Sequence, residues 1–162
     1  ITEAAGQIAR YTDRFCPLHS SNGLRVKKQY GAKGATGEAK QGFPHVIHIG
    51  LPALHKARKL GIYETSARID TLVTLIANLD DTCILHRAGP VVLEEVKMAA
   101  SNVLEAGGVS TSMGKQRLEA LDHILLSSNA SPGGSADLLA AVLFLDRISL
   151  FKESYTSAGR SG

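Results

Sequence analysis

Apolar residues recur along this chain at intervals of three and four, the spacing of one face of an α-helix. The clearest case is residues 64–79, whose apolar positions are Ile69, Leu72, Val73, Ile76 and Leu79. Similar patterns predict helices over residues 2–15, 21–30, 51–60, 91–106, 114–127 and 138–150. No stretch shows the alternation of a strand, so we predict an all-α fold with a single compact multi-helix domain.

Proline and glycine mark the ends of these helices. Pro17 closes the first one, Pro52 stands in the first turn of 51–60, and Gly61 follows the end of that helix. The glycine-dense residues 31–44 and the run 86–90 are predicted to be irregular connections.

The last helix, residues 138–150, is apolar on nearly all sides. A helix of this kind is usually central and buried all round. We therefore predict a central buried C-terminal helix, with buried side chains at Leu139, Val142, Leu143 and Leu145. The small, polar residues 154–162 are predicted to be a flexible tail, which leaves residues 1–153 as the domain.

Composition narrows the class of protein. Hydrophobic residues make up 44% and charged residues 20% of the chain, a globular balance. A net charge of +3 is too small to indicate nucleic-acid binding. Cys16 and Cys83 are far apart and read as free thiols of a reducing cytoplasm. We find no membrane span or signal peptide in the pattern, and the start at Ile1 rather than Met is compatible with a fragment of a longer protein.

Three polar or glycine-rich segments interrupt the helical pattern, and the first is residues 31–39. Its closely spaced Gly34 and Gly37 would let backbone N–H groups approach phosphate oxygens, with Lys33 as a nearby positive charge. The alternative is a bent transition from helix to loop that carries a solvated lysine.

The second segment is residues 80–87. Asp80 and Asp81 follow a predicted helix C-terminus, which prefers cations, and a Mg²⁺ ion would compensate for this placement. His86 and Arg87 would add a proton carrier and a forked phosphate donor. Alternatively, one aspartate caps the following turn and His86 is a half-buried side chain with a structural partner.

The third segment is residues 131–137, a Ser-Pro-Gly-Gly-Ser-Ala-Asp run before the apolar helix. Free N–H groups at a helix start can bind an anion. Ser135 and Asp137 are equally good helix-start residues without any ligand. Because a polyphosphate needs donors from several loops, we predict that the second and third segments face each other across one pocket.

Taken together, the segments resemble the ordered motifs of the triphosphoribosyl-dephospho-CoA synthase family over about residues 20–150. These motifs are Gly34-Ala35-Thr36-Gly37-Glu38-Ala39 with Gly42-Phe43-Pro44, Asp80-Asp81-Thr82 with His86-Arg87, and Ser131-Pro132-Gly133-Gly134-Ser135-Ala136-Asp137. The Asp81-Thr82-Cys83 variant and Leu143-Phe144-Leu145-Asp146 are more similar to the malonate decarboxylase branch than to the citrate lyase branch.

The resemblance implies a transferase that joins the triphosphoribosyl group of ATP to the ribose 2′-hydroxyl of 3′-dephospho-CoA and releases adenine. It implies Mg²⁺, a cytoplasmic location, delivery of the product to a holo-acyl-carrier-protein synthase, and a possible homo-oligomer. The expected catalytic residues are Asp81, His86 and Glu38, and the expected metal ligands are Asp80 and Asp81. The expected substrate-binding residues are Gly34, Gly37, Lys33, Arg87, Ser131, Gly133, Gly134, Ser135 and Asp137.

The chain departs from the family pattern at several points. Thr36 and Ala88 stand where the family commonly has Arg and Gly, and two N-terminal family motifs do not occur. Two other functions therefore stay open. One is a helical, Mg²⁺-dependent hydrolase of nucleotides or ADP-ribose, and the other is a non-catalytic helical interaction module.

Overall fold

The structure, a computed structural model, describes residues 1–9, 29–32 and 34–158, and it confirms the all-α prediction for this part of the chain. Its helices are α1 (Thr2–Ile8), α3 (Gly34–Lys40), the π-helical segment Val46–Gly50, α4 (Leu51–Lys59), α5 (Glu64–Asn78), α6 (Thr82–Glu105), α7 (Ser112–Ser127) and α8 (Gly133–Ala158). Residues 21–28 of the helix predicted at 21–30, and residues 10–15 of the one predicted at 2–15, lie outside the described residues. None of the described helices combines the length and hydrophobicity that a membrane span requires.

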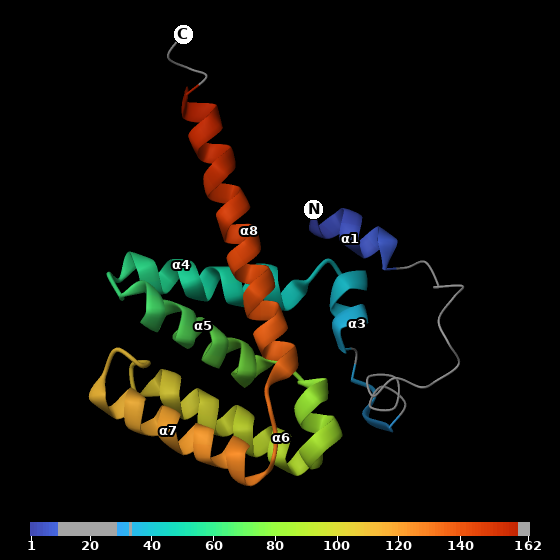
Figure 1. Cartoon of the computed structure of the whole chain (residues 1–162), viewed down its shortest axis with the longest axis vertical. Coiled ribbons are helices and arrows are strands. Elements are labelled where there is room, and N and C mark those ends of the chain that lie inside the picture. The colour runs from blue at the N-terminus through green and yellow to red at the C-terminus, as the bar shows by residue number, and fades with distance from the viewer. Residues whose placement is uncertain (10–28, 33, 159–162) are drawn as a thin grey trace.

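Helices α4, α5, α6 and α7 pack in this order, each against the next, and α8 packs against α5, the π-helical segment and α6 (Figure 1). One apolar cluster joins α5, α6 and α7, and a second joins α4, α5 and α8. Helix α5 contributes to both, with Val73 and Ile76 in the first cluster and Ala67 and Leu75 in the second. The central helix is therefore α5, which buries more than the single face that its sequence pattern indicates.

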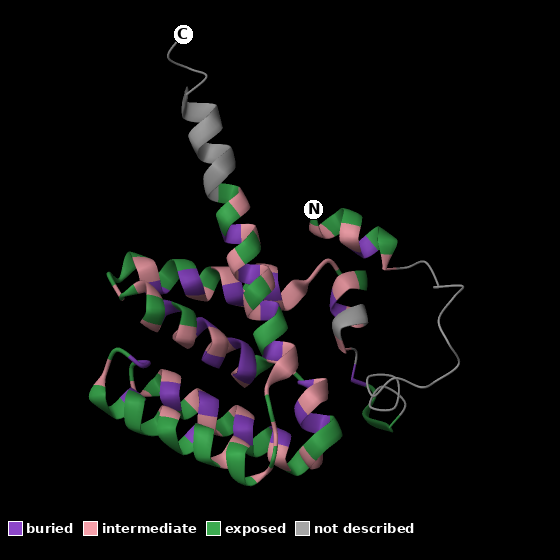
Figure 2. Ribbon diagram, viewed as in Figure 1, coloured by how far each residue is buried: buried purple, intermediate pink, exposed green. Residues whose placement is uncertain are grey.

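The prediction that the C-terminal helix is buried on every side is wrong. Within the part of α8 whose side chains are described, the buried residues form one stripe: Ser135, Leu138, Val142 and Asp146. Leu139, Leu143 and Leu145 are only half-buried, and Phe144 is 60% exposed. The helix also continues to Ala158, and its C-terminal part extends beyond the other helices (Figures 1 and 2). An apolar surface is buried only where another element packs against it, and within the described part of the chain only one side of α8 has such a partner.

Residues 86–90, predicted to be an irregular connection, are instead part of α6, which is kinked. The helix begins at Thr82, and the only non-helical backbone angles within it are those of Gly89, with φ 80° and ψ −179°. Pro90 has no N–H for the helix ladder and disfavours helical geometry at the residue before it. Glycine adopts the positive φ without strain, so the kink falls at Gly89.

Helix α4 was predicted to begin near Pro52, but helical backbone starts at Pro44 and passes through the π-helical segment. There the N–H of Leu51 donates to the carbonyl of Val46, five residues earlier. Such a wider turn accommodates a proline, which can neither donate to the carbonyl four residues before it nor fit closely against it.

Gly50, the last residue of this segment, lies against α8. A β-carbon at this position would lie 2.4 Å from Cγ2 of Val142, whose stiff, branched side chain is fully buried. The absence of a side chain at residue 50 is therefore what allows α8 to approach this closely.

We expect Gly50→Ala to lower the free energy of unfolding by roughly 1–3 kcal/mol, the usual cost of overpacking a core. Chemical denaturation of Gly50→Ala, Val142→Ala and the double variant checks this. Because Val142→Ala removes the methyl group that clashes, the double variant should lose less stability than the two single variants combined. Strictly additive losses would contradict the close approach.

Candidate functional site

Asp81 lies where the N-termini of two helices meet. It is the N-cap of α6, and its Oδ1 accepts a hydrogen bond from the N–H of Cys83 at 2.9 Å. Oδ1 also accepts from the N–H of Gly134 at 3.3 Å. Oδ2 accepts from the N–H and the hydroxyl of Ser135 at 2.8 and 2.9 Å. The carboxylate thus satisfies free donors at the positive ends of both α6 and α8, where a negative charge is stabilised.

Two glycines of the 131–137 segment make this junction possible. A β-carbon on Gly134 would lie 3.1 Å from Oδ1 of Asp81, and one on Gly133 would lie 2.9 Å from Sγ of Cys83. Their small size serves the packing of α8 against α6. The backbone N–H of Gly134, which we expected to bind a phosphate, is already used by Asp81.

The electrostatic argument was therefore wrong for Asp81, and the alternative that one aspartate caps the following turn is confirmed. Helix α5 ends at Asn78, and Asp81 belongs to the start of α6 rather than to the end of α5. Its charge is well placed without any metal ion. The expected proximity of the 80–87 and 131–137 segments is confirmed, since Asp81 itself joins them.

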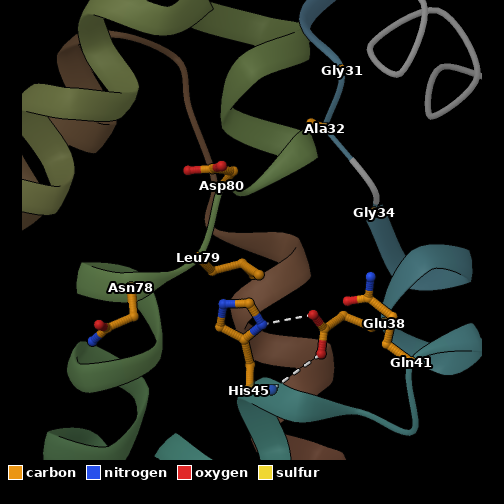
Figure 3. A pocket seen from close by; sticks show the side chains of 9 residues that line it. All are labelled: Gly31, Ala32, Gly34, Glu38, Gln41, His45, Asn78, Leu79 and Asp80. Carbon is orange, nitrogen blue, oxygen red and sulfur yellow. Dashed lines mark hydrogen bonds and ion pairs between the residues drawn. The ribbon is translucent and has the colours of Figure 1, made fainter.

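Two neighbouring cavities lie beside the place where Asp81 joins the starts of α6 and α8. The larger one has a volume of about 240 Å³ and is shown in Figure 3. Its lining residues are Gly31, Ala32, Gly34, Glu38, Gln41, His45, Asn78, Leu79 and Asp80. The smaller one, of about 40 Å³, is lined by Gly34, Glu38, Leu79, Asp80, Thr82, Gly134, Asp137 and Leu138. Because the two share Gly34, Glu38, Leu79 and Asp80, we treat them as one site and call it the α3–α8 cavity.

Glu38, on α3, is the most buried charged residue of this cavity, with 7% of its surface exposed. Its Oε1 lies 2.6 Å from Nδ1 of His45, and its Oε2 accepts the backbone N–H of His45 at 3.3 Å. Both contacts hold the start of the helical stretch that begins at Pro44 against α3.

Sequence reasoning did not select His45. The available signal was the break at Phe43-Pro44 just before it, where Phe43 has a φ of 61°. A bulky residue in this left-handed region is strained, and such strain clusters at functional sites.

Asp80 also faces the cavity. Its side chain is 65% exposed, and its Oδ1 accepts a hydrogen bond from Nζ of Lys97 at 2.9 Å. Lys97, on α6, was not singled out from the sequence because it lies mid-helix among other charged residues.

The remaining predicted residues are distributed as follows. His86 and Arg87 are exposed on α6 and line neither cavity, so this placement does not support a role for His86 at an attacking hydroxyl. Gly37 lies within α3, in a segment that forms a short helix instead of the expected loop. Ser131 is exposed before α8, and Lys33 lies outside the described residues.

Mg²⁺ commonly binds through one or two carboxylates together with substrate phosphates. Asp80 and Asp137 fit this requirement, because both are exposed and line the smaller cavity. Asp81 does not fit, since both of its oxygens already accept hydrogen bonds and its side chain is buried. Among the described residues, no group of three or more His, Cys, Asp and Glu side chains is arranged to hold a metal ion by itself.

Cys83 is a free thiol, as expected, whereas Cys16 lies outside the described residues. Burial raises the pKa of the Cys83 thiol, and the nearby negative charge of Asp81 raises it further. This thiol therefore stays protonated at neutral pH and is a poor nucleophile.

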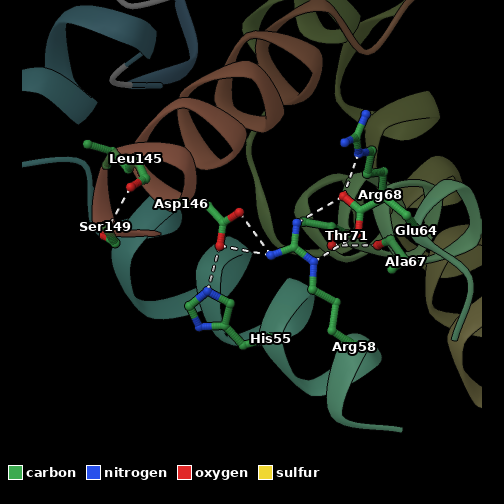
Figure 4. Close-up of polar contacts among 9 residues, drawn as sticks. All are labelled: His55, Arg58, Glu64, Ala67, Arg68, Thr71, Leu145, Asp146 and Ser149. Carbon is green, nitrogen blue, oxygen red and sulfur yellow. Dashed lines mark hydrogen bonds and ion pairs between the residues drawn. The ribbon is translucent and has the colours of Figure 1, made fainter. Parts of the chain in front are cut away.

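A second polar cluster joins α4, α5 and α8 away from the cavity (Figure 4). Nη1 of Arg58 donates to both carboxylate oxygens of Asp146 at 2.9 Å, and Nε2 of His55 lies 2.9 Å from Asp146 Oδ1. Arg58 also makes two bonds to Glu64, which in turn binds Arg68. The sequence pattern missed this cluster because its partners Arg58 and Asp146 are 88 residues apart.

These ion pairs shift the pKa values of the carboxyl groups. Hydrogen bonds from Arg58 and then Arg68 lower the pKa of Glu64 to about 2. Burial alone would raise the pKa of Asp146, but its bonds to Arg58 and His55 outweigh burial and lower it. Both groups are therefore charged at neutral pH, and the cluster fastens α8 to α4 and α5.

Comparison with known proteins agrees with the resemblance noted in the sequence. The chain is 49% identical to a probable 2-(5''-triphosphoribosyl)-3'-dephosphocoenzyme-A synthase of Pseudomonas fluorescens, over 89% of this chain and 50% of that protein. It is 45% identical to the 2-(5''-triphosphoribosyl)-3'-dephosphocoenzyme-A synthase of Klebsiella pneumoniae, over 91% of this chain and 53% of that protein. The chain thus spans about half the length of the curated relatives it matches.

No solved structure matches the chain. A family model described as ATP:dephospho-CoA triphosphoribosyl transferase matches residues 5–155, which is nearly the whole chain. The chain therefore belongs to the ATP:dephospho-CoA triphosphoribosyl transferase family.

Proposed function

We propose that this chain forms the nucleotide-handling part of a transferase that joins the triphosphoribosyl group of ATP to the ribose 2′-hydroxyl of 3′-dephospho-CoA and releases adenine. The observation that carries the proposal is the convergence of the family's three motifs on one cavity, to which each motif contributes a carboxylate. Glu38 comes from the first motif, Asp80 from the second and Asp137 from the third. Segments about fifty residues apart in sequence are held together there by the buried Asp81.

The reaction needs compensation for the triphosphate charge and stabilisation of an oxocarbenium-like sugar. Asp80 and Asp137 would hold Mg²⁺ against the phosphates, and the ion would neutralise charge on the phosphate oxygens. Lys97, whose Nζ lies 2.9 Å from Oδ1 of Asp80, would add a positive charge beside that carboxylate. Asp81 would act indirectly, by fixing the relative position of α6 and α8.

The proposal extends to the cellular role that the family implies. We place the reaction in the cytoplasm, with the product passed to a holo-acyl-carrier-protein synthase, in malonate decarboxylase maturation rather than in that of citrate lyase. The similarity of residues 81–83 and 143–146 to the malonate branch supports this choice.

Product analysis of the purified chain with ATP, Mg²⁺ and 3′-dephospho-CoA tests the proposed function. Free adenine in amounts equal to the coupled triphosphoribosyl product supports transfer. Inorganic phosphate or free ribose instead would indicate the alternative, a Mg²⁺-dependent hydrolase. If the chain forms none of these products and calorimetry detects no binding of MgATP, the chain is a non-catalytic helical module.

We expect Asp80→Asn to raise the Mg²⁺ concentration needed for half-maximal adenine release roughly 10- to 100-fold, the scale seen when support of a bound metal is lost. Calorimetry should show a parallel weakening of MgATP binding. Asp122→Asn is the matched control, since Asp122 is an exposed aspartate on α7. An unchanged Mg²⁺ requirement in Asp80→Asn would contradict the assignment of this carboxylate.

A further inference from the structure

The pair formed by Glu38 and His45 has the geometry of a carboxylate that orients an imidazole. The 2.6 Å contact between Glu38 Oε1 and His45 Nδ1 is short, as expected for a charge-assisted hydrogen bond. The carboxylate is itself fixed, because it is buried and its other oxygen accepts the backbone N–H of His45. The same carboxylate therefore holds the backbone of His45 through one oxygen and orients the imidazole through the other.

With Glu38 ionised, this contact places the proton of a neutral His45 ring on Nδ1. An ionised carboxylate has no proton to donate, so Nδ1 of His45 must be the donor. In a neutral imidazole the other nitrogen, Nε2, then keeps its lone pair. Figure 3 shows Nε2 pointing away from Glu38, toward the side of the cavity formed by residues 78–80.

The site offers this nitrogen to a ligand. His45 lines the larger cavity, and 26% of its side chain is exposed, so the ring is reachable without being loose. No hydrogen bond or ion pair of the described residues uses Nε2. Asp80, the proposed ligand of the Mg²⁺ ion at the triphosphate, lines the same cavity.

We propose that His45 is the general base of the transfer reaction and that Glu38 is its positioning residue, an inference that rests on the proposed function. Nε2 takes the proton of the ribose 2′-hydroxyl of 3′-dephospho-CoA, while the oxygen of that hydroxyl forms a bond to C1 of the ATP ribose. The bond from C1 to the adenine nitrogen breaks, and its electron pair leaves with adenine. The proton then passes from His45, directly or through water, to the departing adenine, which restores the neutral imidazole.

A purely structural role for the pair is the competing explanation, since Glu38 also fixes the start of the helix at Pro44. The two explanations differ in what they require of Nε2. A structural pair needs only the Nδ1 contact, whereas a base needs Nε2 unprotonated and near the hydroxyl. The test must therefore report on the ring itself and on turnover separately from folding.

The first measurement is NMR of the chain with ¹⁵N-labelled histidine. We expect His45 to be mainly in the form protonated at Nδ1, and Nε2 to shift when 3′-dephospho-CoA is added but less with its 2′-deoxy analogue. Glu38→Gln should reduce the Nδ1-protonated population and lower kcat with it. A wild-type His45 protonated mainly at Nε2 would overturn the inference even if every variant failed to fold.

The second measurement is adenine release by His45→Asn. We expect kcat to fall by about 10²- to 10⁴-fold, the contribution of a positioned general base, with little change in the KM for ATP. His48→Asn is the matched control, because His48 is exposed three residues further along and should keep wild-type kcat. If the wild-type chain releases adenine and a folded His45→Asn retains most of its kcat, the inference alone is overturned. If the wild-type chain releases none, the proposed function falls and the inference with it.

Discussion

Replacement of Asp81 by alanine is expected to lower the free energy of unfolding by on the order of 3 kcal/mol. Loss of the α6 N-cap accounts for about 1 kcal/mol. The rest comes from the α8 start, where the loss of even one hydrogen bond to a charged group costs about 1.5–3 kcal/mol. After the change, the N–H groups of Gly134 and Ser135 are left in a buried place without an acceptor.

Thermal and chemical denaturation measure this loss of stability. An asparagine variant adds an intermediate case. Asp81→Asn keeps one acceptor oxygen but places an NH₂ group against other donors, so its stability should lie between those of the wild type and Asp81→Ala. If Asp81 were instead a metal ligand, as the sequence analysis predicted, Asp81→Asn would keep an intact fold and lose almost all activity. Asp80→Asn is the control, because Asp80 is largely exposed. If Asp81→Ala has the same melting temperature as the wild type, the contact of Asp81 with the starts of α6 and α8 does not stabilise the fold.

Replacement of Arg58 by methionine is expected to cost on the order of 3 kcal/mol, the low end for breaking a buried ion pair from one side. Asp146 is buried, with 7% of its side chain exposed, and Arg58 is the partner that bonds both of its oxygens. His55 alone, with a half-exposed ring, would be left to compensate the charge. Arg68→Met is the matched control, since its pair with Glu64 is exposed and should contribute only about 0.3–0.5 kcal/mol.

The acid side of the stability profile tests the same cluster. A carboxyl group whose pKa is lowered by folding stabilises the protein above its unfolded value, and this stabilisation is lost as the pH falls. For Glu64 the window lies between its ordinary value of 4.5 and about 2. Because Arg58 is the main cause of that shift, the stability difference between wild type and Arg58→Met should narrow as the pH falls through this window. A difference that stays constant would contradict the assignment.

Local sequence patterns located most of the helices. Glu64–Asn78 and Ser112–Ser127 were predicted to within two residues at each end, because their apolar spacing and flanking turn residues act locally. The family motifs were also visible in the sequence, since they interrupt those patterns with glycine and charge. The convergence of the 80–87 and 131–137 segments was correctly expected from the chemistry of a polyphosphate.

The roles within the motifs could not be assigned in this way. Asp81 was interpreted as a metal ligand because two adjacent carboxylates seemed to follow a helix end. The structure shows a helix start, and the partners that satisfy its carboxylate come mainly from residues 134 and 135. His45 was overlooked because the sequence around it does not indicate that Glu38 contacts its side chain.

The sequence by itself determined that the chain is helical, roughly where its helices lie, and to which family it belongs. These properties depend on interactions between residues a few positions apart and on motifs read in order. Only the tertiary structure decided that α5 rather than α8 is central, that Asp81 joins two helix starts, and that Arg58 holds Asp146. Burial and hydrogen bonding at these positions are set by residues up to 91 positions away, and their free energy depends on that packing.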